Sequence, residues 1–218
     1  MIRLARFANE PRILAERKVE WLAAFKLALV KDPKKHPHSS QYAHKEVVDA
    51  LERMSFHKCF YCEQSTADGD KEIDHYVEVA EDPDGAFAWA NLDLSCVKCN
   101  NKTSNRSAPV ADYLDPCDPT VDPRAHLTFE KEIIRSRNGS AKGQATIKKY
   151  NLGRPDLDLK RARMLQRFTD VLIGIHQKMI SDGRRVMKAD EKEMLESFRQ
   201  PEHPFSLMFT VQMERSSP

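Results

Sequence analysis

The chain has 218 residues, of which 40% are hydrophobic and 31% are charged, and its formal net charge is +2. This composition is typical of a globular protein and excludes a wholly disordered chain. No run of about eighteen apolar residues is present, which excludes a transmembrane helix. The first residues lack the apolar centre of a secretory signal. We therefore expect a cytoplasmic location and no membrane partner.

The near-neutral net charge hides two oppositely charged segments. Residues 63–84 contain nine acidic residues and one lysine, a balance of −8. Residues 131–163 contain ten basic and three acidic residues, a balance of +7. The basic segment has one aromatic residue, Tyr150, so it is suited to contact phosphates rather than to stack bases. Solvated protein faces remain the alternative for both segments.

The N-terminal region, residues 1–55, is predicted to be helical. Apolar residues recur at helical spacing over 10–30, and Asp32-Pro33 ends this helix. A second helix is expected to begin near Ser39 or Ser40, either of which can cap it. Its predicted buried stripe consists of Tyr42, Val47, Val48, Leu51 and Met54.

Residues 56–108 are predicted to form a separate small module of short strands and turns. The strand candidates are residues 56–61 and 73–79, with a turn at Asp68-Gly69-Asp70 between them. Residues 98–105 suit a short helix.

The C-terminal region, residues 109–218, is predicted to contain one strand and two helices. A strand over 126–135 is followed by a hairpin turn at Asn138-Gly139. A long helix over 155–182 opens with Pro155 in its first turn, and another covers 187–199. Residues 204–213 fit a helix or a strand. The expected fold class is α+β, a mostly helical scaffold that carries a small module.

Four of the five cysteines form two pairs, Cys59-x-x-Cys62 and Cys96-x-x-Cys99, separated by 33 residues. In a cytosolic chain such pairs favour metal binding over disulfides. One Cys-x-x-Cys turn presents two thiolates to an ion, and two turns complete a tetrahedral zinc site. A closed site leaves no position for water, so we predict a structural zinc that stabilises the module. Cys117 is predicted to be a free thiol.

Polar residues lie between and beside the cysteine pairs, namely Asp74-His75, Asn91 and Asn100. At the end of a strand, an adjacent aspartate and histidine can both reach one ion and its water. Taken singly, these residues have ordinary alternatives: a surface turn, a loop asparagine and a helix cap. Their joint placement around two cysteine pairs favours a catalytic site.

This arrangement resembles the HNH endonuclease motif of the ββα-metal fold. The family pattern is Cys-x-x-Cys, an acidic residue with histidine, an asparagine, and a second Cys-x-x-Cys followed by histidine or asparagine. The chain is an H-N-N variant, with Asn100 in the last position. Family members often carry a lysine three residues later, where this chain has Thr103. Lys102 and Arg106 are therefore the candidates for nucleic-acid contact.

The resemblance implies a role for each polar residue. His75 would be the general base, and Asn91 would hold its loop in position. Asp74 and Asn100 would bind one Mg²⁺ or Mn²⁺ through oxygen. That cation would stabilise charge on the leaving 3′ oxygen. Family chemistry leaves 5′-phosphate and 3′-hydroxyl ends.

The order of segments beyond the motif resembles the HNH proteins of bacterial anti-phage defence, the Septu and retron-associated systems. The matching segments are a Leu114-Asp115-Pro116 loop, the strand near His126 and the Asn151-Leu152-Gly153-Arg154 turn. The resemblance implies an effector nuclease acting on DNA with a PtuA-like ATPase in a larger hetero-oligomeric complex. It also places the basic segment 131–163, which contains the Asn151–Arg154 turn, in a scaffold that grips nucleic acid or the ATPase. The alternative is a non-catalytic, zinc-stabilised module that binds nucleic acid or protein.

Overall fold

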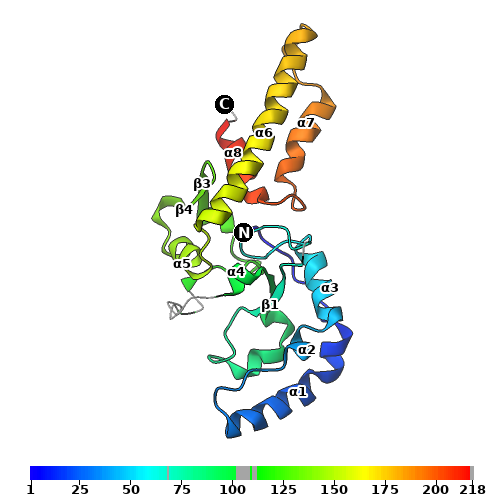
Figure 1. Cartoon of the computed structure of the whole chain (residues 1–218), viewed down its shortest axis with the longest axis vertical. Coiled ribbons are helices and arrows are strands. Elements are labelled where there is room, and N and C mark those ends of the chain that lie inside the picture. Colours follow the sequence, from blue (N-terminus) through cyan, green and yellow to red (C-terminus); the bar gives the residue numbers. More distant parts are fainter. Residues whose placement is uncertain (68, 102–108, 110–111, 217–218) are drawn as a thin grey trace.

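Helices and two short hairpins make up the chain in a computed structural model, which describes residues 1–67, 69–101, 109 and 112–216 (Figure 1). Within those residues the two sheets have two strands each. The α+β class with a mostly helical scaffold is thereby confirmed. None of the described helices is long and apolar enough to cross a membrane.

The first helix is present as expected, whereas the second is divided. Helix α1 (Arg12–Lys31) matches the predicted helix. The predicted second helix is two helices, α2 (Ser39–Tyr42) and α3 (Lys45–Met54). His38 and His44 cap them by accepting hydrogen bonds from the backbone N–H groups of Ser40 and Glu46. The predicted serine cap is therefore wrong, because each helix is capped by the histidine before it.

The central module is a strand pair followed by a short helix. Strand β1 (Glu72–His75) pairs antiparallel with β2 (Leu92–Ser95), and α4 (Val97–Asn100) follows directly. The 3₁₀ helices η1 (Pro83–Phe87) and η2 (Trp89–Asn91) connect the strands. The helix predicted over 98–105 is present up to residue 100, and residues 102–105 lie outside the described residues.

The strand predicted over 56–61 is absent from the structure. Phe56 and His57 both have a φ of 56°, which is left-handed backbone and cannot continue a strand. A strand would also send Cys59 and Cys62 to opposite faces, because side chains alternate along it. The turn that replaces the strand keeps both thiols on one side.

A hairpin and a helix follow the module. Strands β3 (Leu127–Glu130) and β4 (Ile133–Ser136) pair antiparallel. The single strand predicted over 126–135 is therefore wrong: the chain reverses at Lys131, whose φ is 55°. The 3₁₀ helix η4 (Pro123–Ala125) precedes the hairpin. Asn138-Gly139 lies in η5 (Arg137–Gly139), which leads into α5 (Ala141–Lys149).

The remaining chain is helical. Helix α6 (Pro155–Ser181) matches the prediction, and the expected helix over 187–199 is α7 (Ala189–Glu196) with η6 (Ser197–Arg199). The segment over 204–213, which fits a helix or a strand by sequence, forms helix α8 (Ser206–Ser216). The far half of α6 projects with α7 from the rest of the molecule (Figure 1).

One hydrophobic cluster draws on the whole chain. It includes Leu14 and Val47 from the N-terminal region, Leu92 from the module, and Leu152 and Phe209 from the C-terminal region. The central module is therefore packed against helices from both sides. The division into residues 1–55, 56–108 and 109–218 stays a prediction.

Candidate functional site

The four paired cysteines meet at one buried point. Their Sγ atoms all lie within 4.8 Å of one another, and those of Cys62 and Cys96 are 3.9 Å apart. Zinc–sulfur bonds of about 2.3 Å in a tetrahedron require sulfur atoms about 3.8 Å apart. The four thiols therefore fit a zinc ion. Cys117 is not a member of this group.

Local turns create the cluster. The backbone N–H of Glu63 donates to the Cys59 carbonyl at 3.0 Å, and the N–H of Cys59 donates to the Gln64 carbonyl at 2.9 Å. Cys96 stands at the start of α4, and the N–H of Cys99 donates to its carbonyl at 3.0 Å. Each pair is thus closed on itself by main-chain hydrogen bonds, and the fold has only to bring the two turns together.

A buried arginine faces the thiols. The guanidinium of Arg154 lies 3.5 Å from the Cys99 Sγ and 3.7 Å from the Cys96 Sγ. Hydrogen bonds from the other cysteines, together with this cation, lower the pKa of the Cys62 thiol. Arg154 thereby offsets part of the negative charge that four thiolates would carry. The sequence places Arg154 in a basic segment predicted to belong to a scaffold that grips nucleic acid or an ATPase, but Arg154 itself is buried and cannot reach such a partner.

Three of the four predicted catalytic side chains line one open cleft of about 360 Å³. They are Asp74 and His75, at the end of β1, and Asn100, at the end of α4. The other lining residues, which the sequence did not single out, are His36, Pro37, Tyr42, Ile73, Glu78, Val79 and Ala80. The strand end lets neighbouring residues reach the same space.

The imidazole of His75 has a defined orientation. Its Nε2 lies 2.9 Å from the carbonyl oxygen of Ala86. Because a carbonyl only accepts, Nε2 carries the hydrogen, and a neutral ring then has its basic lone pair on Nδ1. The ring of Tyr42 packs against this imidazole with centroids 4.7 Å apart.

Asn91 lies behind the cleft and ties down the loop that follows β1. Its Nδ2 donates to the carbonyls of Val77 (3.0 Å) and Gly85 (3.1 Å), and its Oδ1 accepts from the Val77 N–H at 2.7 Å. A Cβ on Gly85 would lie 2.8 Å from this Nδ2, so the close approach requires glycine. Since Ala86 follows Gly85, Asn91 also positions the carbonyl that orients His75.

Asp74 is held by a tyrosine from the first cysteine turn. The Tyr61 hydroxyl lies 3.0 Å from Oδ2 of Asp74 and 3.1 Å from Oδ2 of Asp93, its cross-strand neighbour. Burial raises the pKa of Asp93, although Arg6 binds its other oxygen at 2.6 Å. Tyr61 therefore connects the cysteine cluster to the cleft, a connection that no spacing in the sequence indicates.

Asn100 completes the described part of the cleft. Its Nδ2 donates to Oε2 of Glu72 at 2.6 Å. The amide oxygen Oδ1 takes no part in this hydrogen bond, and its lone pairs point away from Glu72. The predicted nucleic-acid contacts Lys102 and Arg106 lie outside the described residues.

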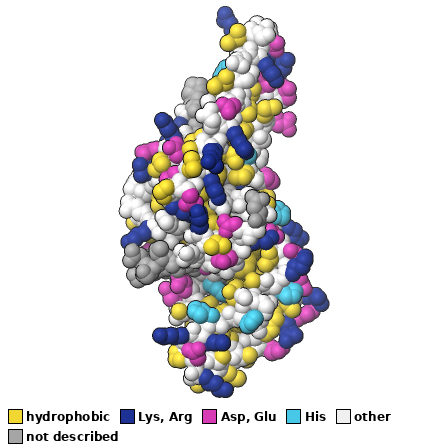
Figure 2. All heavy atoms as spheres, viewed as in Figure 1, with side chains coloured by type: hydrophobic (Ala, Val, Ile, Leu, Met, Phe, Trp, Pro, Cys, Tyr) yellow, Lys and Arg dark blue, Asp and Glu magenta, His cyan; other side chains and the backbone are white. Residues whose placement is uncertain are grey.

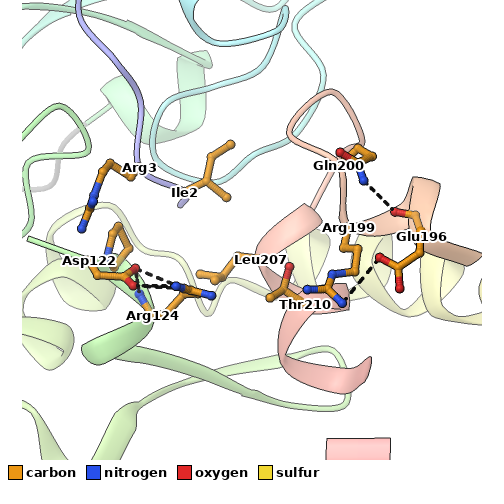
Figure 3. A pocket seen from close by; sticks show the side chains of 10 residues that line it. Ile2, Arg3, Asp122, Arg124, Glu196, Arg199, Gln200, Leu207 and Thr210 are labelled. Carbon is orange, nitrogen blue, oxygen red and sulfur yellow. Dashed lines mark hydrogen bonds and ion pairs between the residues drawn. The ribbon is translucent and has the colours of Figure 1, made fainter. Parts of the chain in front are cut away.

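A second cleft, of about 420 Å³, lies between the N-terminal segment, η4 and α8 (Figure 3). Four of its charged side chains form pairs: Arg124 contacts Asp122 at 3.0 Å, and Arg199 contacts Glu196 at 3.5 Å. Arg3 donates to the carbonyl of Val121 instead. None of the predicted catalytic residues lines it.

Comparison with known families agrees with this geometry. Residues 59–106 match the family model of the HNH endonuclease. The matched segment holds both cysteine pairs and the polar residues of the cleft, on a ββα unit. The chain therefore contains an HNH endonuclease domain.

Three curated relatives carry the comparison further. The chain is 30% identical over 198 residues to the Septu protein PtuB of Bacillus mycoides, covering 76% of this chain and 64% of that protein. It is 24% identical over 145 residues to a Vibrio cholerae protein named provisionally as the HNH endonuclease of retron Vc95, covering 62% and 71%. It is 29% identical over 110 residues to the PtuB of Bacillus thuringiensis, covering 49% and 41%. The chain thus spans less than two thirds of the first relative.

Proposed function

We propose that this chain is a metal-dependent HNH endonuclease that hydrolyses phosphodiester bonds of DNA. The observation that carries the proposal is the single cleft lined by Asp74, His75 and Asn100, with Asn91 holding the loop beneath it. A zinc-stabilised binding module would explain the cysteines but has no need of these groups in one open space.

In this proposal His75 is the general base. Its Nε2 donates to the Ala86 carbonyl, so Nδ1 is the atom that accepts a proton from the attacking water. The Ala86 contact also stabilises the imidazolium that results, because the carbonyl dipole faces the ring N–H. Asn91 acts through the loop and is a positioning residue.

Asp74 and Asn100 supply the oxygen atoms suited to a hard divalent cation, Mg²⁺ or Mn²⁺. When bound, such a cation places positive charge against the scissile phosphate and the leaving oxygen. Tyr61 keeps the Asp74 carboxylate in one orientation by its hydrogen bond at 3.0 Å. Glu72 does the same for the Asn100 amide.

Zinc at Cys59, Cys62, Cys96 and Cys99 is proposed to be structural. All four thiols are buried, so a bound ion has no open position for water. Elemental analysis should find one zinc per chain. Replacement Cys96→Ser should release it and lower the melting temperature, and a Cys96→Ser protein with full zinc and unchanged melting would contradict the assignment. Cys117→Ser is the matched control.

The similarity to Septu and retron-associated proteins supports a role in anti-phage defence. We propose that the nuclease works with a PtuA-like ATPase within a larger complex. Co-expression with a PtuA-like ATPase should give a complex that co-purifies, and separate elution of the two proteins would contradict this partner.

The decisive experiment compares wild-type protein with His75→Ala on plasmid DNA, with and without Mg²⁺ or Mn²⁺, alone and with the ATPase. His176→Ala is the control, because this histidine is exposed on α6 away from the cleft. Cleavage that requires metal and is lost only in His75→Ala is expected. Equal cleavage by His75→Ala and His176→Ala would show that His75 is not the general base. A zinc-loaded protein that cleaves nothing under any of these conditions would favour the binding module.

A further inference from the structure

The basic segment 131–163 does not form one charged surface. Lys149, Arg154 and Arg161 are buried in the core, and Arg135 pairs with Glu130 at 3.1 Å. Much of the positive charge that the sequence places in one block is therefore buried or paired within the protein. Outside α6, Lys131, Arg135 and Lys148 are exposed but lie on different elements, and on α6 itself the exposed basic residues of the segment share one face.

Three exposed basic residues share one face of α6: Lys160, Arg163 and Arg167. Residues three and four positions apart lie on the same side of a helix, and seven residues span about 10 Å. We call these three side chains the α6 basic face. Figure 2 shows Lys and Arg side chains gathered over the lower half of α6.

The α6 basic face borders a groove of about 240 Å³. Gln64 and Ser65, which follow the first cysteine turn, form the opposite side together with Pro204 and Phe205. The groove therefore runs from α6 to the first cysteine turn of the HNH domain itself.

The two arginines of this face form no ion pair with the described part of the protein. Lys160 donates to the neutral Gln64 amide at 2.7 Å. Among the residues that the structure describes, Arg163 and Arg167 have no carboxylate within ion-pair distance. In the cleft of Figure 3, by contrast, Arg124 and Arg199 each have one. An exposed cation without an internal partner keeps its attraction for an external anion.

The start of this face is tied to the catalytic module. Lys98 of α4 contacts Asp156, in the first turn of α6, with 2.9 Å between Nζ and Oδ2. Asp156 lies one turn before Lys160 on the same side of the helix. Asn100, at the end of α4, lines the catalytic cleft. Helix α4 therefore joins the catalytic cleft, at Asn100, to the first turn of α6, at Asp156.

We propose that the α6 basic face binds the phosphodiester backbone of the nucleic acid whose cleavage is the proposed function. One strand of DNA carries a phosphate about every 3.4 Å along the axis, so three cations over about 10 Å match about three phosphates. Contacts of this kind position the polymer without reading its sequence. Three cations repeated along an open groove suit a regular polyanion better than the irregular acidic surface of a protein.

The test measures binding of a fluorescein-labelled DNA duplex by anisotropy, in EDTA so that no cleavage occurs, over a series of salt concentrations. The variant is Arg163→Gln/Arg167→Gln. The control, Lys178→Gln/Arg185→Gln, removes the same charge from exposed positions further along the chain. Circular dichroism melting establishes that both are folded.

The variant is expected to bind about tenfold more weakly than the control at physiological salt. Its slope of log K against log salt should be shallower by about 1.8, that is, about 0.9 for each lost phosphate contact. Equal affinity and equal slope in the two double variants would overturn the proposal. So would unchanged DNA binding combined with loss of the co-purified ATPase, which would assign the face to a protein partner.

The outcome for the proposed function is read separately. Wild-type protein that binds DNA through this face but does not cleave it in Mg²⁺ would refute the nuclease proposal and leave the binding surface intact. Metal-dependent cleavage by the wild type, combined with unchanged DNA binding by Arg163→Gln/Arg167→Gln, would support the nuclease proposal and refute the binding surface.

Discussion

Asn91→Asp is the most specific perturbation of the candidate site, because it keeps the shape of the side chain and removes its hydrogen-bond donors. The introduced carboxyl can still accept from the Val77 N–H at 2.7 Å. As a carboxylate it cannot donate to the carbonyls of Val77 and Gly85, which the amide now reaches at 3.0 and 3.1 Å. Two acceptors would then face a negative charge in a buried position.

The expected cost at neutral pH is about 3–5 kcal/mol in the free energy of unfolding. Two lost hydrogen bonds contribute about 1 kcal/mol each, and the unpaired buried carbonyls add about 1 kcal/mol or more. The two carbonyls raise the folded-state pKa of the introduced carboxyl above its unfolded value of about 3.9. The native variant therefore binds more protons than its unfolded state, so its destabilisation grows as pH rises above about 4.

Urea unfolding at pH 4 and pH 7, compared with wild type at each pH, measures this dependence. Asn9→Asp is the control, because Asn9 is exposed and far from the loop in the chain. Cleavage should fall together with stability, since the loop also positions the Ala86 carbonyl that contacts His75. A free energy of unfolding that differs from wild type by the same amount at both pH values would refute the reasoning. Full activity in a folded variant would show that the loop need not be held.

Three further predictions follow from the contacts around the site. Tyr61→Phe removes the hydroxyl between the two aspartates, so the Mg²⁺ concentration for half-maximal cleavage should rise severalfold while zinc content stays unchanged; a shift in zinc content instead would contradict this role. Gly85→Ala places a Cβ 2.8 Å from the amide of Asn91 and should cost about 1–3 kcal/mol in thermal or urea unfolding, whereas Gly153→Ala, where nothing lies within 4 Å, should cost much less. Burial raises the pKa of Glu63, but the N-terminal ammonium and Lys58 outweigh it and bring the pKa from 4.5 to about 2. This stabilisation is complete above about pH 4.5 and is lost as pH falls towards 2; Glu63→Gln should therefore cost about 3 kcal/mol at pH 7, with a smaller difference near pH 3, and a pH-independent difference would refute the ion pairing.

The predictions from sequence hold where a feature depends on residues that are close together in the chain. A Cys-x-x-Cys turn is closed by hydrogen bonds among neighbouring residues. The spacing alone therefore indicates that the thiols of Cys59 and Cys62 lie side by side. Helices α1 and α6 are long and amphipathic, and their apolar periodicity needs no partner to be recognised. The HNH pattern is also local, since Asp74 to Asn100 lie within one short segment.

Other features depend on partners that are distant in the chain. Strand β1 is stabilised by its pairing with β2. The strand predicted over 56–61 is absent because the turn that brings Cys59 and Cys62 together needs a different backbone. In the sequence, Tyr61 cannot be distinguished from any core tyrosine. Its hydrogen bonds to Asp74 and Asp93 are seen only in the folded protein.

The sequence by itself indicated the class of chemistry, because two Cys-x-x-Cys pairs and the polar residues of the HNH pattern occur at short, fixed spacings. Only the tertiary structure decided which groups support that chemistry. Arg154 faces the thiols from 55 residues beyond Cys99. Lys149, Arg154 and Arg161 of the 131–163 block are buried, whereas Lys160 and Arg163 lie exposed on α6. Electrostatic and hydrogen-bonding roles depend on distance in space and on burial, and neither can be read from distance along the chain.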